Sequence, residues 1–149
     1  ISNVSGKFDK FNGTFEYDEK TNRLKSFIGK IEVESINTAN EKRDGHLKSA
    51  DFFDAKKFPQ IAFKLISTSD DEAIGELTIK GITRKVTFDY ENNGVIKDPW
   101  GNTKLGMSLE TKISRKEFGL TWNKVLETGS FVVGDKITIN VDIEAKKIN

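Results

Sequence analysis

Apolar and polar residues alternate along much of this chain, and the alternation is clearest near its C-terminal end. In "KITINVDIEAK" single polar residues separate five apolar ones, which are Ile137, Ile139, Val141, Ile143 and Ala145. Successive side chains of a β-strand point to opposite faces, so this period of two predicts a strand with one buried and one solvated face. The same period recurs in three further segments, as Ile61, Phe63 and Leu65, as Val86, Phe88 and Tyr90, and as Leu105, Met107, Leu109 and Ile113.

Two earlier segments follow the strand pattern more loosely and contain glycine. They are Phe11, Phe15 and Tyr17 around Gly13, and Phe27, Ile31 and Val33 around Gly29. A glycine inside a strand predicts a bulge or tight curvature. Turn-forming segments such as "YDEKTNR", "STSDDE", "KGITRK" and "DPWGN" separate the runs at the spacing of hairpins.

Only two segments depart from the strand pattern. One is "RDGHLKSADFFDAKKFPQIAF", where the apolar spacing after His46 predicts a short helix near residues 46–55. The other is "SRKEFGLTWN", which we expect to be an irregular connection. Seven or eight amphipathic strands in an antiparallel meander bury their apolar faces either as a sandwich or as a closed barrel, and the pattern alone does not decide between them. No segment marks a boundary, so residues 1–149 are expected to form a single domain.

Composition excludes several classes of function. The 24 basic and 23 acidic residues leave a net charge of +1, which provides no overall field for nucleic acid or an anionic membrane. There is no cysteine, which excludes disulfides, thiolate catalysis and cysteine-based zinc sites. No apolar run exceeds three residues, far short of the roughly 20 that span a bilayer. Because the chain begins with Ile1, we expect it to come from a longer precursor.

The single histidine, His46, lies beside Asp44, and a carboxylate can orient an imidazole for proton transfer. No cysteine nucleophile, second histidine or GxSxG elbow accompanies it. The favoured interpretation is structural, with Asp44 capping the following helix, Arg43 pairing locally and His46 packing or hydrogen-bonding in that turn. The acidic clusters lie in turns without calcium-loop spacing, so we expect no catalytic residue, metal site or cofactor.

The two tryptophans are better functional candidates than His46. Trp100 lies in the turn "DPWG", where packing over a strand end is favoured, and Trp122 either plugs a barrel mouth or touches a ligand, although core packing is favoured for it too. The strand aromatics share a face with aliphatic residues. That arrangement favours a core or an apolar ligand over nucleic acid.

The order of four segments resembles the YceI-like family of bacterial, mostly periplasmic, isoprenoid-binding proteins. The segments are "SINTANEKRDGHLKSADFFDAKKFPQIAF", "GELTIKGITRKVTFDY", "DPWGNTKLGMSLETKISRKEFGLTWN" and "VGDKITINVDIEA". The resemblance implies a lipocalin-like antiparallel β-barrel of about eight strands that holds a polyisoprenoid, an isoprenoid quinone or a fatty-acid derivative without catalysis. It also implies a periplasmic or secreted location, and it makes the segment from Arg43 to His46 a signature of the fold.

One departure from the family concerns the N-terminal side. Members usually carry a further strand, with an Asp and a His-Ser or His-Thr pair, before the segment that "ISNVSGKF" resembles. Either that first strand is missing from the chain or the barrel is open along one seam. The sequence does not decide between a monomer and a homodimer.

The expected ligand is a long-chain lipid held by apolar contact in the barrel lumen. The residues expected to line the lumen are Phe15, Ile31, Val33, Phe63, Phe88, Met107, Leu109, Trp122 and Ile139. The alternative is a filled-core β-sandwich that acts as an interaction or adhesion module through its loops. A weaker third possibility is a hydrolase or isomerase that uses His46.

Overall fold

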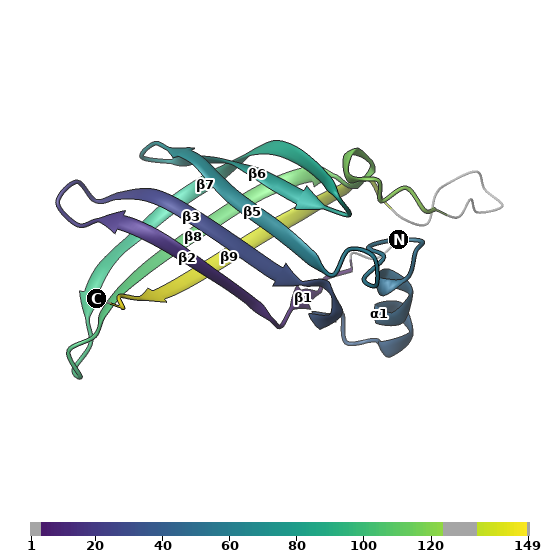
Figure 1. Ribbon diagram of the computed structural model, residues 1–149, viewed down its shortest axis with the longest axis horizontal. Helices are drawn as coiled ribbons and strands as arrows, with labels where there is room; N and C mark the ends of the chain where they lie inside the picture. The colour runs from purple at the N-terminus through teal and green to yellow at the C-terminus, as the bar shows by residue number, and fades with distance from the viewer. Residues whose placement is uncertain (1–3, 124–133, 149) are drawn as a thin grey trace.

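A computed structural model describes residues 4–123 and 134–148 of the chain, and it is dominated by one antiparallel sheet (Figure 1). The strands of this sheet are β2 (Phe11–Asp18), β3 (Arg23–Glu32), β5 (Gln60–Thr68), β6 (Glu72–Ile79), β7 (Ile82–Lys97), β8 (Thr103–Ser114) and β9 (Lys136–Lys146). They are hydrogen-bonded in the order β2-β3-β5-β6-β7-β8-β9, so each strand lies beside its predecessor in the sheet. The predicted antiparallel meander is confirmed.

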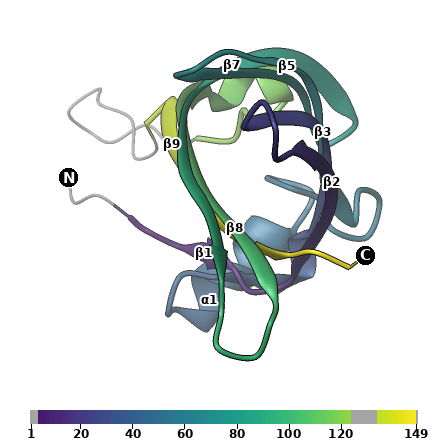
Figure 2. The same cartoon turned by 90° about the vertical axis from the view of Figure 1, so that its left-hand side faces the viewer.

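The sheet curls strongly around its own axis, as Figure 2 shows from one end. In the described part of the chain no pairing joins β2 to β9, the two edge strands. The fold is therefore a lipocalin-like half-barrel, open along a seam between these edges. This agrees with the predicted all-β fold class.

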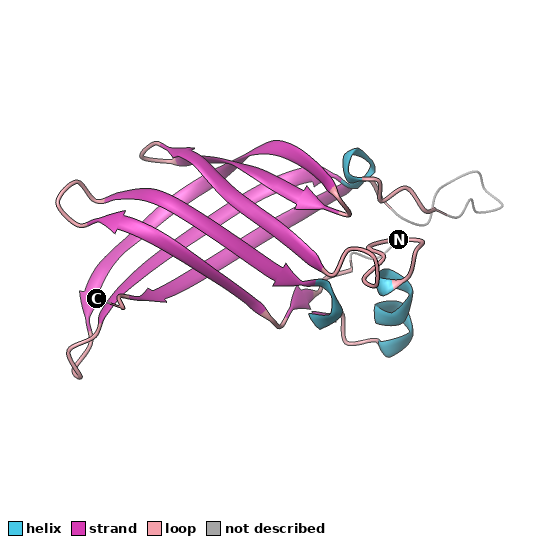
Figure 3. Ribbon diagram, in the orientation of Figure 1, coloured by secondary structure: helices cyan, strands magenta, loops and turns pink. Residues whose placement is uncertain are grey.

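Short elements gather at one end of the half-barrel (Figure 3). They are β1 (Lys7–Phe8) paired with β4 (Ile36–Asn37), the helix α1 (Glu41–Lys48), and the 3₁₀-helices η1 (Val33–Ser35) and η2 (Arg115–Phe118). No helix of the described residues has the length and apolar character needed to cross a bilayer.

The predicted position of the short helix, near residues 46–55, is wrong. The helix spans Glu41–Lys48, because the side chain of Asn40 caps it by accepting the backbone N–H of Arg43 at 3.0 Å. The segment after Lys48 forms turns instead. Asp44 is not the cap as predicted, since its carboxylate accepts the backbone N–H of Thr38 at 2.9 Å. Arg43 does interact locally, by donating to the side chain and carbonyl of Thr38.

Of the bulge or tight curvature predicted at Gly13 and Gly29, the bulge is not found there. The two glycines are directly paired in continuous register, and the β2–β3 bulge falls at Glu16 and Tyr17 instead. A Cβ atom on Gly13 would lie 2.7 Å from Cε1 of Phe27. The absence of a side chain at Gly13 therefore makes room for the Phe27 ring.

The concave face of the sheet carries the core, which divides into two clusters. The helix-end cluster, next to α1, consists of Val33, Phe52, Ala55, Ile61, Leu77, Ile79, Ile113, Phe118 and Leu120. The hairpin-end cluster, toward the opposite end, consists of Leu24, Leu65, Ala73, Phe88, Tyr90, Leu105, Met107 and Leu109. Phe63, Val86 and Ile139 pack against both clusters, so the apolar face is continuous along the barrel.

Candidate functional site

A row of phenylalanine rings crosses the concave face from the edge strand inward. Phe15 meets Phe27 with ring centroids 5.7 Å apart, Phe27 meets Phe63 at 5.6 Å, and Phe63 meets Phe88 at 5.3 Å. The first and last pairs are edge-to-face, a favoured geometry for aromatic rings. The row joins β2, β3, β5 and β7, so the inner face is aromatic at the boundary between the two clusters.

The central ring of the row lies directly over a glycine of β6. A Cβ atom on Gly75 would lie 2.3 Å from Cζ of Phe63 and 2.8 Å from the carbonyl oxygen of Lys64. Only glycine leaves room for the ring in this position. The alternating pattern does not single out Gly75, because its contact with Phe63 of the neighbouring strand is not visible in the sequence of either strand alone.

The residues expected to line the lumen all belong to the two apolar clusters or pack against them. Phe88, Met107 and Leu109 are buried members of the hairpin-end cluster, and Phe15 packs against them. Val33 is a buried member of the helix-end cluster, and Ile31 and Trp122 pack against it. Phe63 and Ile139 contact both clusters. Val33 belongs to η1 rather than to a strand, and Phe27 completes the aromatic row although it was not among the expected residues.

The inward-facing side chains are more exposed to solvent on the edge strand β9, at the seam, than on the neighbouring strand β8. On β8, Leu105, Met107 and Leu109 are buried, and Met107 is only 1% exposed. On the neighbouring edge strand β9, the inward-facing residues from Ile137 to Ala145 are all half-buried. An apolar strip along β9 therefore stays accessible from the seam.

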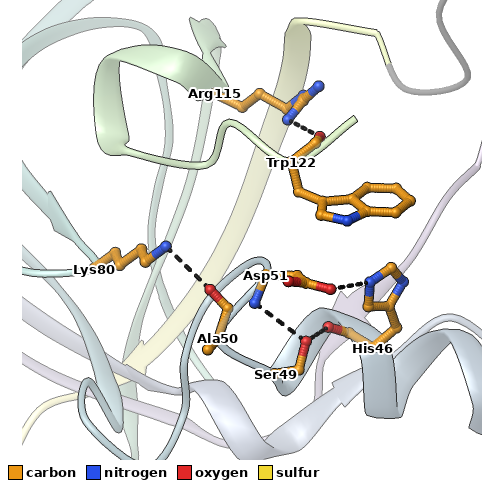
Figure 4. A network of polar contacts seen from close by, with 7 residues as sticks. All are labelled: His46, Ser49, Ala50, Asp51, Lys80, Arg115 and Trp122. Carbon is orange, nitrogen blue, oxygen red and sulfur yellow. Dashed lines mark hydrogen bonds and ion pairs between the residues drawn. The ribbon is translucent and has the colours of Figure 1, made fainter. Parts of the chain in front are cut away.

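A polar network lies at the helix end (Figure 4). His46 Nε2 lies 2.9 Å from Asp51 Oδ2, and the imidazole stands edge-on to Trp122 and Phe52 at centroid distances of 4.6 and 5.0 Å. The Ser49 hydroxyl donates to the backbone carbonyl of His46, so it does not face the imidazole as a nucleophile would. His46, in the last turn of α1, thus packs against and hydrogen-bonds to residues of the following turn, as the structural interpretation expected.

Arg115 holds the adjoining connection in place. Its side chain is 2% exposed and donates to the backbone carbonyls of Leu120, Trp122 and Gly134. These bonds fix residues 115–123 against the end of the barrel, with Trp122 packed beside Phe52. Trp122 is therefore half-buried and packs against the helix-end cluster, in line with the favoured interpretation of core packing.

Trp100 behaves in the opposite way, and its predicted packing over a strand end is wrong. Its side chain is 83% exposed at the tip of the β7–β8 hairpin. The Asp98 carboxylate accepts the backbone N–H groups of Trp100 and Asn102, each at 2.9 Å. Because this turn is held by Asp98, the indole is not needed for packing and points into solvent.

A pocket of about 600 Å³ opens at the hairpin end, opposite α1. Its lining is formed by Tyr17, Thr21, Asn22, Arg23, Leu24, Thr68, Ser69, Asp70, Tyr90, Asn92, Gly94 and Val95. Leu24 and Tyr90 also belong to the hairpin-end cluster, so the pocket borders that cluster. Within the described ranges, no group of three His, Asp or Glu side chains is arranged to hold a metal ion.

Comparisons with known proteins agree with this architecture. The family model of the YceI-like domain matches residues 1–145. A UPF0312 protein of Staphylococcus aureus strain USA300 is 40% identical over 145 residues, which cover 97% of this chain and 85% of that protein. The crystal structure of the Campylobacter jejuni YceI protein superposes with a TM-score of 0.86 at 32% identity, covering 100% of this chain and 88% of that one.

A mutant of the Campylobacter protein, crystallised with a monobromobimane guest, gives a TM-score of 0.87 at 31% identity, with 100% of this chain and 88% of that one covered. BcnA of Burkholderia cenocepacia shares the fold, with a TM-score of 0.74 at 23% identity over 94% of this chain and 86% of that one. The half-barrel, the short helix at its end and the match over nearly the whole sequence lead to one conclusion: this chain belongs to the YceI-like family.

Proposed function

We propose that this protein binds a long-chain amphiphile along the concave face of its half-barrel and carries or stores it. Polyisoprenoids, isoprenoid quinones and fatty-acid derivatives are the candidate ligands. The observation that carries the proposal is the unbroken apolar face that joins the two clusters through Phe63, Val86 and Ile139. Such a face binds a hydrocarbon chain by burial, at roughly 25 cal/mol per Å² of apolar surface removed from water.

The accessible strip along β9 supports the same proposal. Its inward-facing residues are half-buried, so an apolar chain laid along them would remove further apolar surface from water. Family membership favours a binding protein over an enzyme. The helix-end network is consistent with this, because Ser49 is turned away from the His46 imidazole. The proposed periplasmic or secreted location rests on the family resemblance.

A second candidate function is an interaction module whose interior is filled by its own side chains. The observation in its favour is a pair of half-exposed residues, Ile28 on β3 and Ile66 on β5, on adjacent strands. Burial of Met107 among its neighbours is also compatible with a filled interior. The two candidates differ in whether the folded protein takes up an apolar chain.

Two adjacent residues of β9 test the proposal. Ile139 faces inward and contacts both clusters, whereas Thr138 is exposed and pairs with Lys112. We expect Ile139→Asp to weaken binding of heptadecene, measured by displacement of an environment-sensitive dye, roughly tenfold or more, because a carboxylate in an apolar site is strongly unfavourable. Thr138→Asp introduces the same charge on the outer face and should bind as the unmodified protein does.

Circular dichroism of each variant establishes that it is folded. Ile143→Asp, at a half-buried position opposite Met107 on the same face, provides a second inward charge if Ile139→Asp does not fold. Absence of heptadecene binding by the unmodified, folded protein would overturn the carrier proposal and favour the interaction module. Equal binding by the inward and outward variants would place the ligand away from the concave face.

A further inference from the structure

The hairpin end of the barrel contains a buried polar atom without a partner. Tyr90 is 7% exposed, and in the described part of the chain its hydroxyl has no hydrogen-bond partner. Buried side-chain polar atoms are paired in the large majority of cases, so an unpaired hydroxyl in a native structure calls for an explanation. Tyr90 is also part of the lining of the 600 Å³ pocket.

The polar groups next to Tyr90 are already engaged with one another. The Tyr17 hydroxyl accepts a hydrogen bond from Asn92 Nδ2 at 2.9 Å and lies 3.4 Å from Asn22 Oδ1, to which it donates. Asn92 Nδ2 also approaches the backbone carbonyl of Asn22 at 3.3 Å. These bonds position the walls of the pocket and leave the Tyr90 hydroxyl without an acceptor among the described residues.

The charge of the pocket limits which polar group fits there. Among the lining residues, Arg23 and Asp70 are the charged ones, and their formal charges cancel. Recognition of a phosphate or pyrophosphate generally draws on several cationic or N–H donors. Burial raises the pKa of the Tyr90 phenol, and the neighbouring Tyr17 raises it further, so the phenol stays a neutral donor.

We propose that the Tyr90 hydroxyl donates a hydrogen bond to an uncharged acceptor, such as a carbonyl oxygen, at the polar end of the bound amphiphile. This inference rests on the proposed function. The apolar part of the ligand would then follow the concave face from the hairpin-end cluster toward Phe63 and the helix-end cluster. Leu24, which belongs both to the pocket and to the hairpin-end cluster, lies at the junction of the two environments.

A matched pair of probes tests the inference: methyl pentadecyl ketone and heptadecene, which have the same number of carbon atoms and differ in the carbonyl group. Affinities of both are measured by dye displacement for the unmodified protein and for Tyr90→Phe. We expect Tyr90→Phe to weaken ketone binding about five- to tenfold, the range of a single hydrogen bond, and to leave heptadecene binding unchanged. Thr78→Val removes a hydroxyl from the outer face of β6 and should change neither affinity.

The experiment distinguishes failure of the proposed ligand binding from failure of the role proposed for Tyr90. If the unmodified protein binds neither probe, the proposed function itself falls. If it binds both and Tyr90→Phe leaves the ketone affinity unchanged, or weakens both probes equally, the role of Tyr90 is overturned while the carrier proposal stands. An ultraviolet titration of tyrosine in the unmodified protein provides a second measurement. Bound ketone should move the phenol titration to higher pH than bound heptadecene, and identical titrations would contradict the inference.

Discussion

The two ends of the half-barrel differ in how their polar side chains are hydrogen-bonded. At the helix end, Arg115 donates to three backbone carbonyls and His46 pairs with Asp51 while packing against Trp122 and Phe52. At the hairpin end, a pocket of about 600 Å³ remains and the hydroxyl of Tyr90 has no partner in the described residues. The polar side chains of the helix end thus pair with groups around them, whereas at the hairpin end the Tyr90 hydroxyl is unpaired among the described residues.

The residue that is most noticeable in the sequence is therefore not the one whose hydrogen-bonding group lacks a partner among the described residues. His46 is the single histidine of the sequence, and it is engaged in packing and in a hydrogen bond. Tyr90 is unremarkable in the sequence, yet it carries the unpaired donor. A polar group can take part in binding when the fold leaves it without a partner, so the less conspicuous residue is the better candidate.

The largest effect is expected from removing the anchor of the helix end. Arg115→Met should lower the free energy of unfolding by about 3 kcal/mol, because buried carbonyls of Leu120 and Trp122 lose a charged donor. Urea denaturation measures the change. Arg84→Met is the control, since Arg84 is exposed and, among the described residues, donates to the carbonyl of Glu117, and it should change stability by less than about 0.5 kcal/mol. Similar losses for both variants would contradict the assigned role of Arg115.

A smaller loss of stability is expected from a substitution at the boundary between the two clusters. Gly75→Ala should lower the free energy of unfolding by about 2 kcal/mol, because the new methyl group overlaps the Phe63 ring and the carbonyl of Lys64. The matched control is Gly45→Ala in α1, where a Cβ atom meets nothing within 4 Å. That variant should stabilise the protein by roughly 0.5–1 kcal/mol, the helix preference of alanine over glycine. Thermal melts that rank the two variants in the opposite order would refute the packing described for Phe63.

His46→Ala is expected to lower stability by about 1 kcal/mol through the lost ring contacts and the lost bond to Asp51. Folded molecules of this variant should keep their ligand. Lys42→Ala, at an exposed position of the same helix, is the control and should change neither property. Unchanged stability together with lost ligand binding would instead make His46 a binding residue.

The smallest effect concerns acid stability at the helix end. Hydrogen bonding from the Ser114 hydroxyl, helped by the backbone N–H of Lys116, holds the pKa of Asp135 below its usual value. The stabilisation is therefore present above the unfolded-state pKa, about 3.9, and is lost as the pH falls through the lower folded-state pKa. Asp135→Asn should flatten the decrease of unfolding free energy below about pH 4. Denaturation curves with the same acid slope for both proteins would show that Asp135 makes no such contribution.

Much of the sheet could be predicted from the sequence, because a strand with one buried and one solvated face shows alternating apolar and polar residues. Leu105, Met107 and Leu109 are buried on one face, and Glu110 is exposed on the other, as expected. The helix was misplaced for a physical reason. No residue of α1 is buried, so the apolar spacing pointed instead to the following turns, where Phe52 is buried.

Features that depend on distant partners could not be predicted in this way. The bond between Asn92 and Tyr17 joins residues 75 positions apart, and the unpaired Tyr90 hydroxyl is apparent only once such contacts are known. The two tryptophans illustrate the same point. Both lie in polar, turn-rich segments, yet Arg115 anchors the connection around Trp122 while the Asp98 carboxylate holds the turn that carries the exposed Trp100. Local pattern does not distinguish these environments.

The most direct test of lipid binding is mass spectrometry of an organic extract of the purified, folded protein after incubation with heptadecene. We expect about one long-chain molecule per protein chain, either heptadecene or a lipid retained from the producing cells, because the proposal places one such chain along the continuous apolar face. An extract that contains no long-chain molecule, from protein whose circular dichroism confirms the β-fold, would contradict ligand binding on the concave face.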